Sequence, residues 1–581
     1  MTEGSLLSLF IAVPLLAAAV AAMAPWMSLR RALGLLVPAF GIVGGVWVLV
    51  KVNEPNTVLV DNVGGFVGGI SIPLVADNLA GIMILTTSVV ALIANWFADV
   101  VGETRTRFYP ALTLMLIGGV WGALLTADLF NLFVFIEVML MPSFGLLAMT
   151  GTWARLAAGR MFIIVNLVTS LVLLSGVVLI YSVVGTTNLA ALAGAAGPRG
   201  TEFAEGVYGN QWQLVIPLGV VLLALAVKAG AAPVHTWLPR AYPSTSPAVM
   251  ALFSGLHTKV GIYAIFRVYL TIFEGDPTWS WAILVIVVLG MLIGGFAGLG
   301  ETTMRSVIAY QMVNGIPFML IGLAFLSDDA RLMLSAALFY MLHHMIVAGS
   351  LIMASGAIEE TYGSGRVRKL SGLMRRDRFV AVVFAAGALA IVGLPPFSGL
   401  WGKLALVFGV AQDGTWKTWL AIGAIIVSSI GALVSMIYVW REVFWGRQMN
   451  ANEADPELRV PRRYVWPSAV MMLISVGMFI GAGPIFQQVN KAADNLTDTT
   501  AYVEAVLGDP DDAVGAVLPP GPSGLDNVPA GARSTTNDDA HTERAERAER
   551  EGRGGHENRE DRESREDRKD TEQQAQNREE R

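Results

Sequence analysis

The chain of 581 residues is 54% hydrophobic and only 15% charged, with 40 basic and 46 acidic residues. Its mean hydropathy is +0.57. These values exclude a soluble globular protein and predict an all-α membrane protein that crosses the bilayer many times. Because the chain has no cysteine, disulfides and thiolate metal sites are excluded as well.

Apolar segments long enough to span a bilayer, about 20 residues each, follow one another through residues 1–487, which we interpret as one transmembrane domain. The first segment has no basic stretch before it and no clear cleavage site, so we expect a retained span and not a signal peptide. We predict about 14 transmembrane helices, with approximate cores at 5–25, 31–51, 77–97, 109–127, 129–149, 161–185, 212–232, 247–273, 279–299, 304–326, 331–354, 379–410, 418–440 and 464–487.

The charges of the loops alternate along the chain. One set of loops carries arginine and lysine, as at 366–378 and 441–463, and the other carries acidic residues, as at Glu54, 274–276 and Asp413. Because loops rich in arginine and lysine stay in the cytoplasm, the first set should be cytoplasmic. An even number of spans puts both termini on one side, which we predict to be the outer side of a bacterial inner membrane.

Residues 488–581 differ in composition from the rest of the chain. Residues 508–532 are rich in Gly, Pro, Asp and Ala, and residues 541–581 are mostly Arg, Glu and Asp. Such a sequence favours a disordered tail or a solvated helix with many charge pairs, and its glycines favour disorder. We expect a charged, disordered C-terminal tail without a role in transport.

Two apolar helices within residues 221–266 each carry a lysine near the middle, Lys228 and Lys259. Gly230 and Pro233 follow Lys228, so the first of these helices should break just after its lysine. A lysine at mid-membrane costs about 3 kcal/mol and therefore usually faces other protein or water. A break at this depth is tolerated only where protein or a cavity satisfies the freed backbone groups. Together the two features indicate an ion path.

Two further ionisable residues lie at membrane depth. Glu137 lies about 12 Å along its helix from Leu129, at ~1.5 Å per residue. Lys403 follows a second proline break, at Pro395 and Pro396. For each residue singly, a structural pairing within the bundle stays open as the alternative. As a set, the ionisable residues exceed what helix packing needs.

The two breaks occupy corresponding positions in two groups of five spans. One lies in the fourth span of residues 109–273, and the other lies in the fourth span of residues 279–440. Corresponding broken helices in two halves point to an inverted-repeat transporter with its path at the repeat interface. We therefore predict two inverted five-helix repeats, on the basis of topology and break position alone.

Histidines could connect the lysines. His343 and His344 are adjacent in one span and could bridge Lys259 to Lys403, because histidine titrates near neutral pH. Packing is the alternative for both, and we expect only one of two consecutive helical residues to face the path well. His257 points to a different face from Lys259 and is interpreted as structural. Other candidates are His235 as an entrance lining, and Tyr310, Gln311 and Asn314 as groups that hold water.

The chemistry of a buried lysine suits proton transfer. An ammonium group in apolar surroundings releases its proton more readily than in water, and a nearby carboxylate opposes that release. The sequence contains no nucleotide-binding loop, metal-ligand cluster or nucleophile elbow. We therefore expect no enzyme activity, no cofactor, no metal site and no nucleic-acid partner, and a driving force from an ion gradient or a partner subunit.

Three motifs resemble one known family: FNLFVFIEVMLMPSFGLL, KAGAAPVHTWLPRAYPSTSPAVMALFSGLHTKVGIYAIFRV and GLPPFSGLWGK. They look like the antiporter-like membrane subunits shared by Mrp-type multisubunit Na⁺/H⁺ antiporters, respiratory complex I and membrane-bound hydrogenases. The resemblance covers roughly residues 75–450 and is greatest to D-type Mrp subunits. It implies the fourteen spans and two inverted repeats, with Glu137, Lys228, Lys259 and Lys403 at the family's key glutamate and lysine positions.

Two positions depart from the pattern of this family. Ala348 stands where members often carry a lysine a few residues after the histidine, and AYQMVNGIP stands where serines often follow AY. The resemblance then implies a central relay that depends more on His343 or His344 and on water.

We interpret the chain as a membrane subunit of a multisubunit Na⁺/H⁺ antiporter that conducts protons along a mid-membrane Lys/Glu/His path. Its expected partners are other membrane subunits, Na⁺, H⁺ and the lipid bilayer. Two alternatives stay open. One is a redox-driven proton-pumping subunit of complex I or of a hydrogenase, and the other is a structural membrane scaffold.

Overall fold

The computed structural model describes residues 3–54, 57–66, 71–149, 153–197, 212–326, 330–450 and 454–508. These residues are mostly helical and include one short antiparallel hairpin of β1 (Leu59–Asn62) and β2 (Pro73–Ala76). Most of the predicted charged tail, residues 509–581, lies outside the described residues. The helices are α1 (Leu9–Met23), α2 (Met27–Lys51), α3 (Asn78–Val101), α4 (Tyr109–Leu125), α5 (Leu129–Ala148), α6 (Trp153–Val184), α8 (Trp212–Ala229), α9 (Trp237–Ala241), α10 (Pro247–Gly255), α11 (His257–Ile272), α12 (Ser280–Ala297), α13 (Met304–Leu320), α14 (Ala330–Tyr362), α15 (Leu373–Arg376), α16 (Arg378–Val392), α17 (Gly399–Gln412), α18 (Trp416–Val439), α19 (Arg462–Ile480), α20 (Ala482–Thr497) and α21 (Thr500–Leu507).

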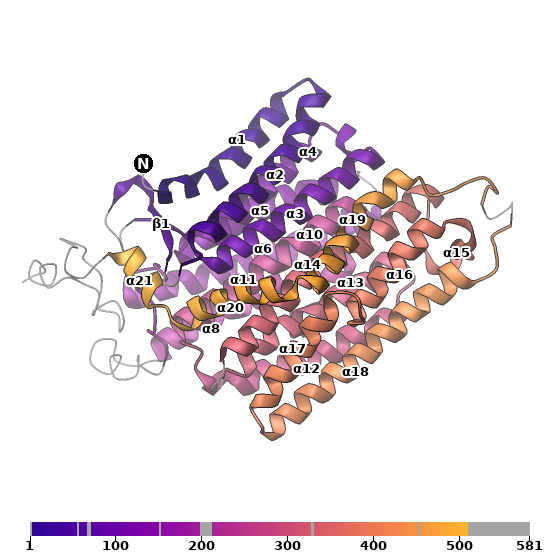
Figure 1. Cartoon of the computed structure of the whole chain (residues 1–581). Helices are drawn as coiled ribbons and strands as arrows, with labels where there is room; N and C mark the ends of the chain where they lie inside the picture. The colour runs from indigo at the N-terminus through magenta and orange to yellow at the C-terminus, as the bar shows by residue number, and fades with distance from the viewer. Residues whose placement is uncertain are drawn as a thin grey trace, which may run out of the picture.

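The helices form one elongated bundle (Figure 1). Among the described residues, 11 helices are long and apolar enough to cross a membrane, and three shorter apolar helices cover 109–125, 213–229 and 378–392. Each predicted span overlaps one of these helices. The chain is therefore an all-helical, multi-pass membrane protein.

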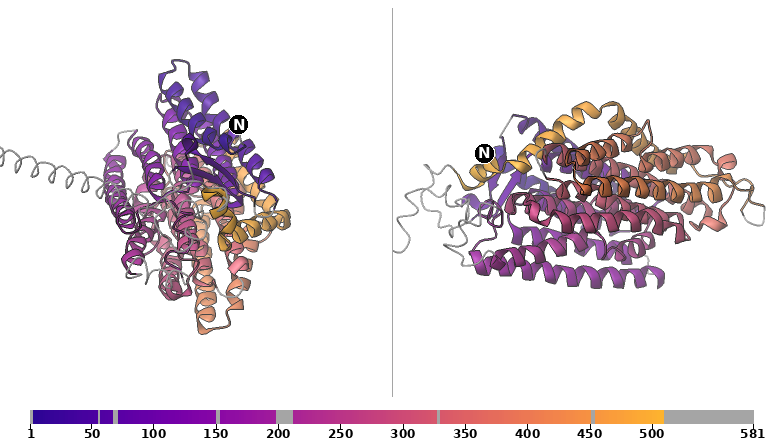
Figure 2. Two further views of the ribbon diagram at one scale, coloured as in Figure 1. Left: turned by 90° about the vertical axis from the view of Figure 1, so that its left-hand side faces the viewer. Right: turned by 90° about the horizontal axis from the view of Figure 1, so that it is seen from below.

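The two ends of the bundle differ in their loops. One end, the acidic end, carries the β-hairpin, α21 and the turn between α17 and α18, and the other, the basic end, carries α15 (Figures 1 and 2). The helices run side by side between these ends. An ionisable group near the middle of a helix is therefore far from both ends.

Helix α14 lies at the centre of the bundle. Residues Met333–Ile358 are buried without interruption, and the helix packs against α3, α10, α13, α16, α17, α19 and α20. A helix that is apolar on all sides belongs in a core, and its many Ala, Gly and Ser residues allow neighbours to approach closely. The side chains of α14 can therefore contact both halves of the protein.

The helix breaks are present where Gly and Pro predicted them. Helix α8 ends at Ala229, just before Gly230, and α16 ends at Val392, just before Gly393. These glycines have φ angles of +80° and +101°, a left-handed conformation that favours glycine. In both breaks a proline follows three residues after the glycine, at Pro233 and Pro396.

A third interruption was not predicted. Leu256 separates α10 from α11, with φ −110° and ψ −61°, so the span that holds Lys259 is also divided. The division falls three residues before this lysine.

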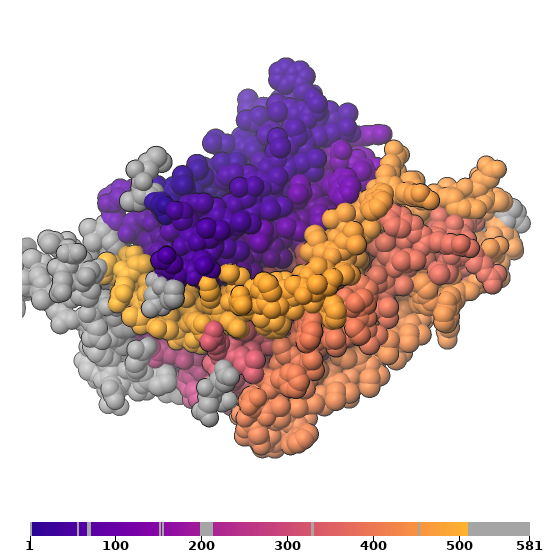
Figure 3. All heavy atoms as spheres, viewed as in Figure 1, coloured from indigo at the N-terminus to yellow at the C-terminus, as the bar shows by residue number. Residues whose placement is uncertain are grey.

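The ordered chain extends beyond the predicted start of the tail at residue 488. Helix α20 is amphipathic and buries Val489 and Leu496 against the bundle, and its polar side bonds with residues that are distant in the chain. Lys491 donates a 2.7 Å hydrogen bond to the carbonyl of Asn53, and Asp494 pairs with Arg331 at 3.0 Å. Figure 3 shows this segment lying across the junction between the N-terminal helices and the later ones.

Candidate functional site

Glu137 of α5 and Lys228 of α8 lie close together inside the bundle. Their Oε1 and Nζ atoms are 4.0 Å apart. Ser170 of α6 lies between them, because Lys228 donates a 2.8 Å hydrogen bond to its hydroxyl, and this hydroxyl donates to Glu137. The carboxylate is 22% exposed and the lysine only 6%. Three helices thus form a charge pair with a hydroxyl bridge, one residue before α8 ends.

Lys259 is fully buried beside the interruption between α10 and α11. Its ammonium group lies 3.4 Å from Nδ1 of His344 and 3.2 Å from the hydroxyl of Thr258. No carboxylate of the described residues lies within 4.0 Å of it. The histidine of α14 is therefore a principal polar neighbour of this lysine.

The hydrogen bonds of His344 indicate its tautomer. Nε2 of this ring lies 3.3 Å from the carbonyl oxygen of Gln311, which can only accept. Nε2 therefore carries the hydrogen, and Nδ1 is free to accept from Lys259. The ring packs on Gly315, where an added Cβ would lie 2.1 Å from Nε2, so glycine at this position leaves space for the imidazole.

His343 is also fully buried but faces the opposite half of the protein. Its Nδ1 lies 2.8 Å from the hydroxyl of Ser398, within the break between α16 and α17. Ser398 lies 2.8 Å from Ser475 of α19. The two histidines thus each contact polar partners, His343 at Ser398 in one half of the protein and His344 at Lys259 in the other.

Lys403 of α17 turns back toward the break that precedes it. It donates 2.9 Å hydrogen bonds to the carbonyl of Val392 and to the hydroxyl of Ser429. Val392 is the last residue of α16, so the ammonium group satisfies a carbonyl that the helix end leaves free. The same group lies 4.8 Å from the centre of the Phe318 ring.

Two of the candidates for holding water are buried in α13. Gln311 is 1% exposed, and within the described part of the chain neither of its side-chain polar atoms has a hydrogen-bond partner. Buried polar groups of this kind commonly bind water. Asn314 instead accepts a 2.5 Å hydrogen bond from Ser428. Tyr310 is only partly buried and does not join the buried cluster.

The other two histidines lie near the first break. His235 lies between α8 and α9, and burial lowers its pKa below the usual value, while a backbone hydrogen bond with Pro233 partly offsets this effect. His257 lies 2.7 Å from the hydroxyl of Ser143 and stacks on Phe253. His235 thus lies in the first helix break, and His257 is held by packing on a face away from Lys259.

Sequence reasoning missed the serines. Ser170, Ser398 and Ser429 each bond directly to one of the ionisable candidates. Serine is common in helices that pack closely in membranes, so its presence alone gives no functional signal. These serines supply neutral hydrogen bonds to buried groups that have few charged neighbours in the described residues.

The described residues contain no group of three or more His, Cys, Asp or Glu that could hold a metal ion. The arrangement is instead a set of buried titratable groups on several helices of the bundle, beside two helix breaks. Buried ionisable residues beside broken helices define a class of polytopic membrane transport proteins.

Comparisons with known proteins agree with this class. The family described as NADH:quinone oxidoreductase/Mrp antiporter, TM matches residues 126–430. The D-type subunit of the Na⁺/H⁺ antiporter of Alkalihalophilus pseudofirmus is 31% identical over 481 residues, which cover 81% of this chain and 94% of that protein. The corresponding D-type subunit of Bacillus subtilis is 30% identical over 450 residues, covering 77% and 88%.

A solved structure is similar over most of the bundle. A chain in the Mrp complex from Dietzia sp. DQ12-45-1b has a TM-score of 0.81 and 38% sequence identity, and the match covers 87% of this chain and 100% of that chain. The present chain therefore belongs to the antiporter-like membrane subunit family that Mrp antiporters share with NADH:quinone oxidoreductase, within the group of D-type subunits. It is a transporter subunit and not an enzyme.

Proposed function

We propose that this chain conducts protons across its width as one membrane subunit of a multisubunit Na⁺/H⁺ antiporter. The observation that carries the proposal is the 3.4 Å contact between Lys259 and His344. It joins the lysine of one half to the central helix, whose neighbouring His343 contacts the break of the other half. The family and the D-type relatives support exchange of Na⁺ for H⁺ as the activity.

The proposed route begins near the basic end. Protons enter by the first break, past His235, and reach Lys228. Glu137 controls the proton affinity of this lysine, because approach of a carboxylate favours the charged ammonium and separation disfavours it. From Lys228 the proton passes to Lys259, with ordered water closing the gap between them.

The second part of the route crosses α14. His344 receives the proton from Lys259 on Nδ1 and can release one from Nε2 beside Gln311. The amide of Gln311 has no hydrogen-bond partner among the described residues, which favours a water molecule at this point. His343 and Ser398 then lead to Lys403, where the path ends. This route uses two histidines and water in place of the lysine that is absent at Ala348.

The topology of the proposal contains fourteen spans, with both termini on the outer side of a bacterial inner membrane. Residues 109–273 and 279–440 form the inverted repeats. Their support is the matched breaks, in which Gly230 and Gly393 share a left-handed φ and a proline at the same spacing. The acidic end is then the outer end, and the basic end is cytoplasmic.

A redox-driven proton pump is the nearest alternative, because the same family includes subunits of NADH:quinone oxidoreductase. It predicts co-purification with redox subunits and no Na⁺-dependent exchange by the complex alone. The scaffold alternative predicts that the buried lysines can be replaced without loss of transport. Both alternatives make predictions that differ from those of an antiporter.

The test uses the intact complex in everted vesicles. Lys228→Ala and Lys403→Ala should each abolish Na⁺-dependent proton exchange while the complex still assembles. Lys369→Ala is the matched control, because Lys369 is an exposed lysine at the basic end, and it should keep normal exchange. Normal exchange in either buried-lysine variant would contradict the proposal. Loss of exchange in the control would show that removal of any lysine reduces exchange.

A further inference from the structure

A line of polar groups leads from Lys259 toward the acidic end of α11. Tyr263 and Arg267 follow at intervals of four residues, so they lie on nearly the same face of the helix as Lys259. Eight residues correspond to about 12 Å along the axis. Along this line a proton on Lys259 could leave the first half directly toward the acidic end. The proposed proton path instead turns from Lys259 into α14.

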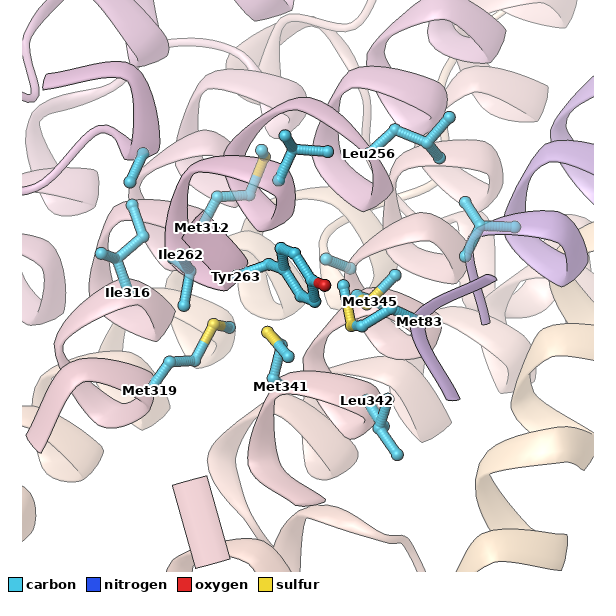
Figure 4. Close-up of a cluster of buried hydrophobic side chains, with 14 of the residues drawn as sticks. Met83, Leu256, Ile262, Tyr263, Met312, Ile316, Met319, Met341, Leu342 and Met345 are labelled. Atoms are coloured by element: carbon cyan, nitrogen blue, oxygen red, sulfur yellow. The ribbon is translucent and has the colours of Figure 1, made fainter. Parts of the chain in front are cut away.

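The first part of this line is closely packed and apolar. Figure 4 shows Tyr263 surrounded by Met83, Met341 and Met345, with further apolar side chains around them. The tyrosine hydroxyl donates a 2.6 Å hydrogen bond to the carbonyl of Leu124. The hydroxyl also accepts a 3.1 Å hydrogen bond from Nη2 of Arg267, and the side chains labelled around its ring are apolar and offer no hydrogen bonds to water.

Arg267 follows this apolar layer on α11, one helical turn nearer to the acidic end than Tyr263. Its Nη1 lies 2.7 Å from a carboxylate oxygen of Asp77, and the two side chains are only 6% and 1% exposed. Asp77 also accepts the 2.9 Å hydrogen bond of the Ala80 amide at the start of α3. The guanidinium lies 5.4 Å from the centre of the Tyr263 ring and 5.3 Å from that of Tyr502 in α21. Partners from its own helix and from two other segments thus hold it in place.

The chemistry of this group is that of a barrier. A guanidinium does not give up its proton in a protein, so it cannot act as a relay. An arginine in a narrow passage also excludes protons and other cations by its charge. A buried ion pair contributes little net stability compared with apolar residues, so stability alone is weak support for a pair at this place.

We propose that Arg267, fixed by Asp77 and covered by Tyr502, is a barrier that closes the acidic end of the first half. Protons that reach Lys259 then leave sideways to His344 and are not lost directly across the membrane. This inference rests on the proposed proton path. It assigns Arg267 a coupling role, without contact to the transferred proton.

The test measures passive proton leak in liposomes that contain the purified complex, under a potassium diffusion potential and without Na⁺. The double variant Arg267→Gln and Asp77→Asn removes both charges and keeps hydrogen-bonding groups. It should leak protons severalfold faster than the native complex. Arg267→Met with Asp77→Leu replaces the pair by apolar groups and should stay tight, because it leaves the layer dry.

Tyr502→Leu separates charge from packing. It removes the ring over the guanidinium and leaves the ion pair, so it should stay tight. Equal leak in Tyr502→Leu and in the Gln/Asn variant would show that the packing of α21, and not the charge, seals this end, and would overturn the proposal. A Gln/Asn variant as tight as the native complex would overturn it as well.

Lys259→Ala added to the Gln/Asn variant distinguishes the two hypotheses. Loss of the leak would show that it passes through Lys259, as the proposed proton path requires. A leak that persists without Lys259 would contradict the proposed path but not the barrier. If the Gln/Asn variant does not assemble, Thr258→Cys decides instead. A membrane-impermeant thiol reagent applied at the acidic end should not label it, and labelling would overturn the barrier.

Discussion

The two halves of the protein hold their lysines in different ways. Lys228 has Glu137 at 4.0 Å, with Ser170 between them. Lys403 has only neutral partners among the described residues, namely the carbonyl of Val392, the hydroxyl of Ser429 and the ring of Phe318. A charge pair can open and close, whereas neutral hydrogen bonds change the proton affinity of a lysine less. Control should therefore lie in the first half.

Removing the charge of Glu137 should have the largest effect on exchange, and it tests the difference between the two halves most strongly. Glu137→Gln keeps a hydrogen-bond acceptor for Ser170 but leaves Lys228 without its carboxylate. We expect Na⁺-dependent proton exchange in everted vesicles to fall by more than about tenfold, because the charged form of the lysine loses its main support.

The control for this variant is Glu359→Gln, which removes a carboxylate that pairs with Arg305 at 2.7 Å near the basic end. It should reduce exchange much less in complexes that assemble. Equal loss in both variants would show that any missing carboxylate disturbs the complex. It would contradict a specific role of Glu137 in controlling Lys228.

The next largest effect should come from Gly315→Ala in α13. An added Cβ would lie 2.1 Å from the ring of His344, so the imidazole must move away from Lys259. We expect a severalfold loss of exchange with normal assembly. Gly423→Ala in α18 is the matched control, because nothing lies within 4 Å of its added Cβ. Unchanged exchange in both variants would contradict the role of the contact between Lys259 and His344.

The smallest effects should come from the serines, and their order tests the comparison. A hydrogen bond to a charged group contributes about 1.5–3 kcal/mol. In Ser170→Ala, Glu137 can move toward Lys228 and replace the lost bond. In Ser429→Ala, no carboxylate of the described residues is near enough to do so. Exchange should thus fall more in Ser429→Ala. A larger loss in Ser170→Ala would show that the lysine of the first half depends more on its serine, which contradicts the comparison.

Much of this arrangement could be predicted from the sequence. Gly230, Pro233 and the prolines at 395 and 396 located the two breaks, because backbone geometry restricts such residues locally. The depth of Glu137 and the lysines followed from helix rise. These features depend on near neighbours in the chain, which a single sequence contains.

The missing parts depend on contacts between distant segments. Ser170 is 58 residues from Lys228, and Asn53 is 438 residues from Lys491, so periodicity gives no sign that they meet. The charged residues of α20 resembled the start of a solvated tail for the same reason. Their partners, Asn53 and Arg331, are far away in the chain, and only the folded bundle brings them close.

The handover across α14 is the central claim, and His344→Asn tests it most directly. Asparagine keeps a polar side chain beside Lys259 and Gln311 but does not titrate, so Na⁺-dependent proton exchange in liposomes with the purified complex should be lost. His257→Asn, at a buried histidine that bonds Ser143, should retain exchange. Loss in the first variant and activity in the second is the predicted result, and full exchange with His344→Asn would contradict the account.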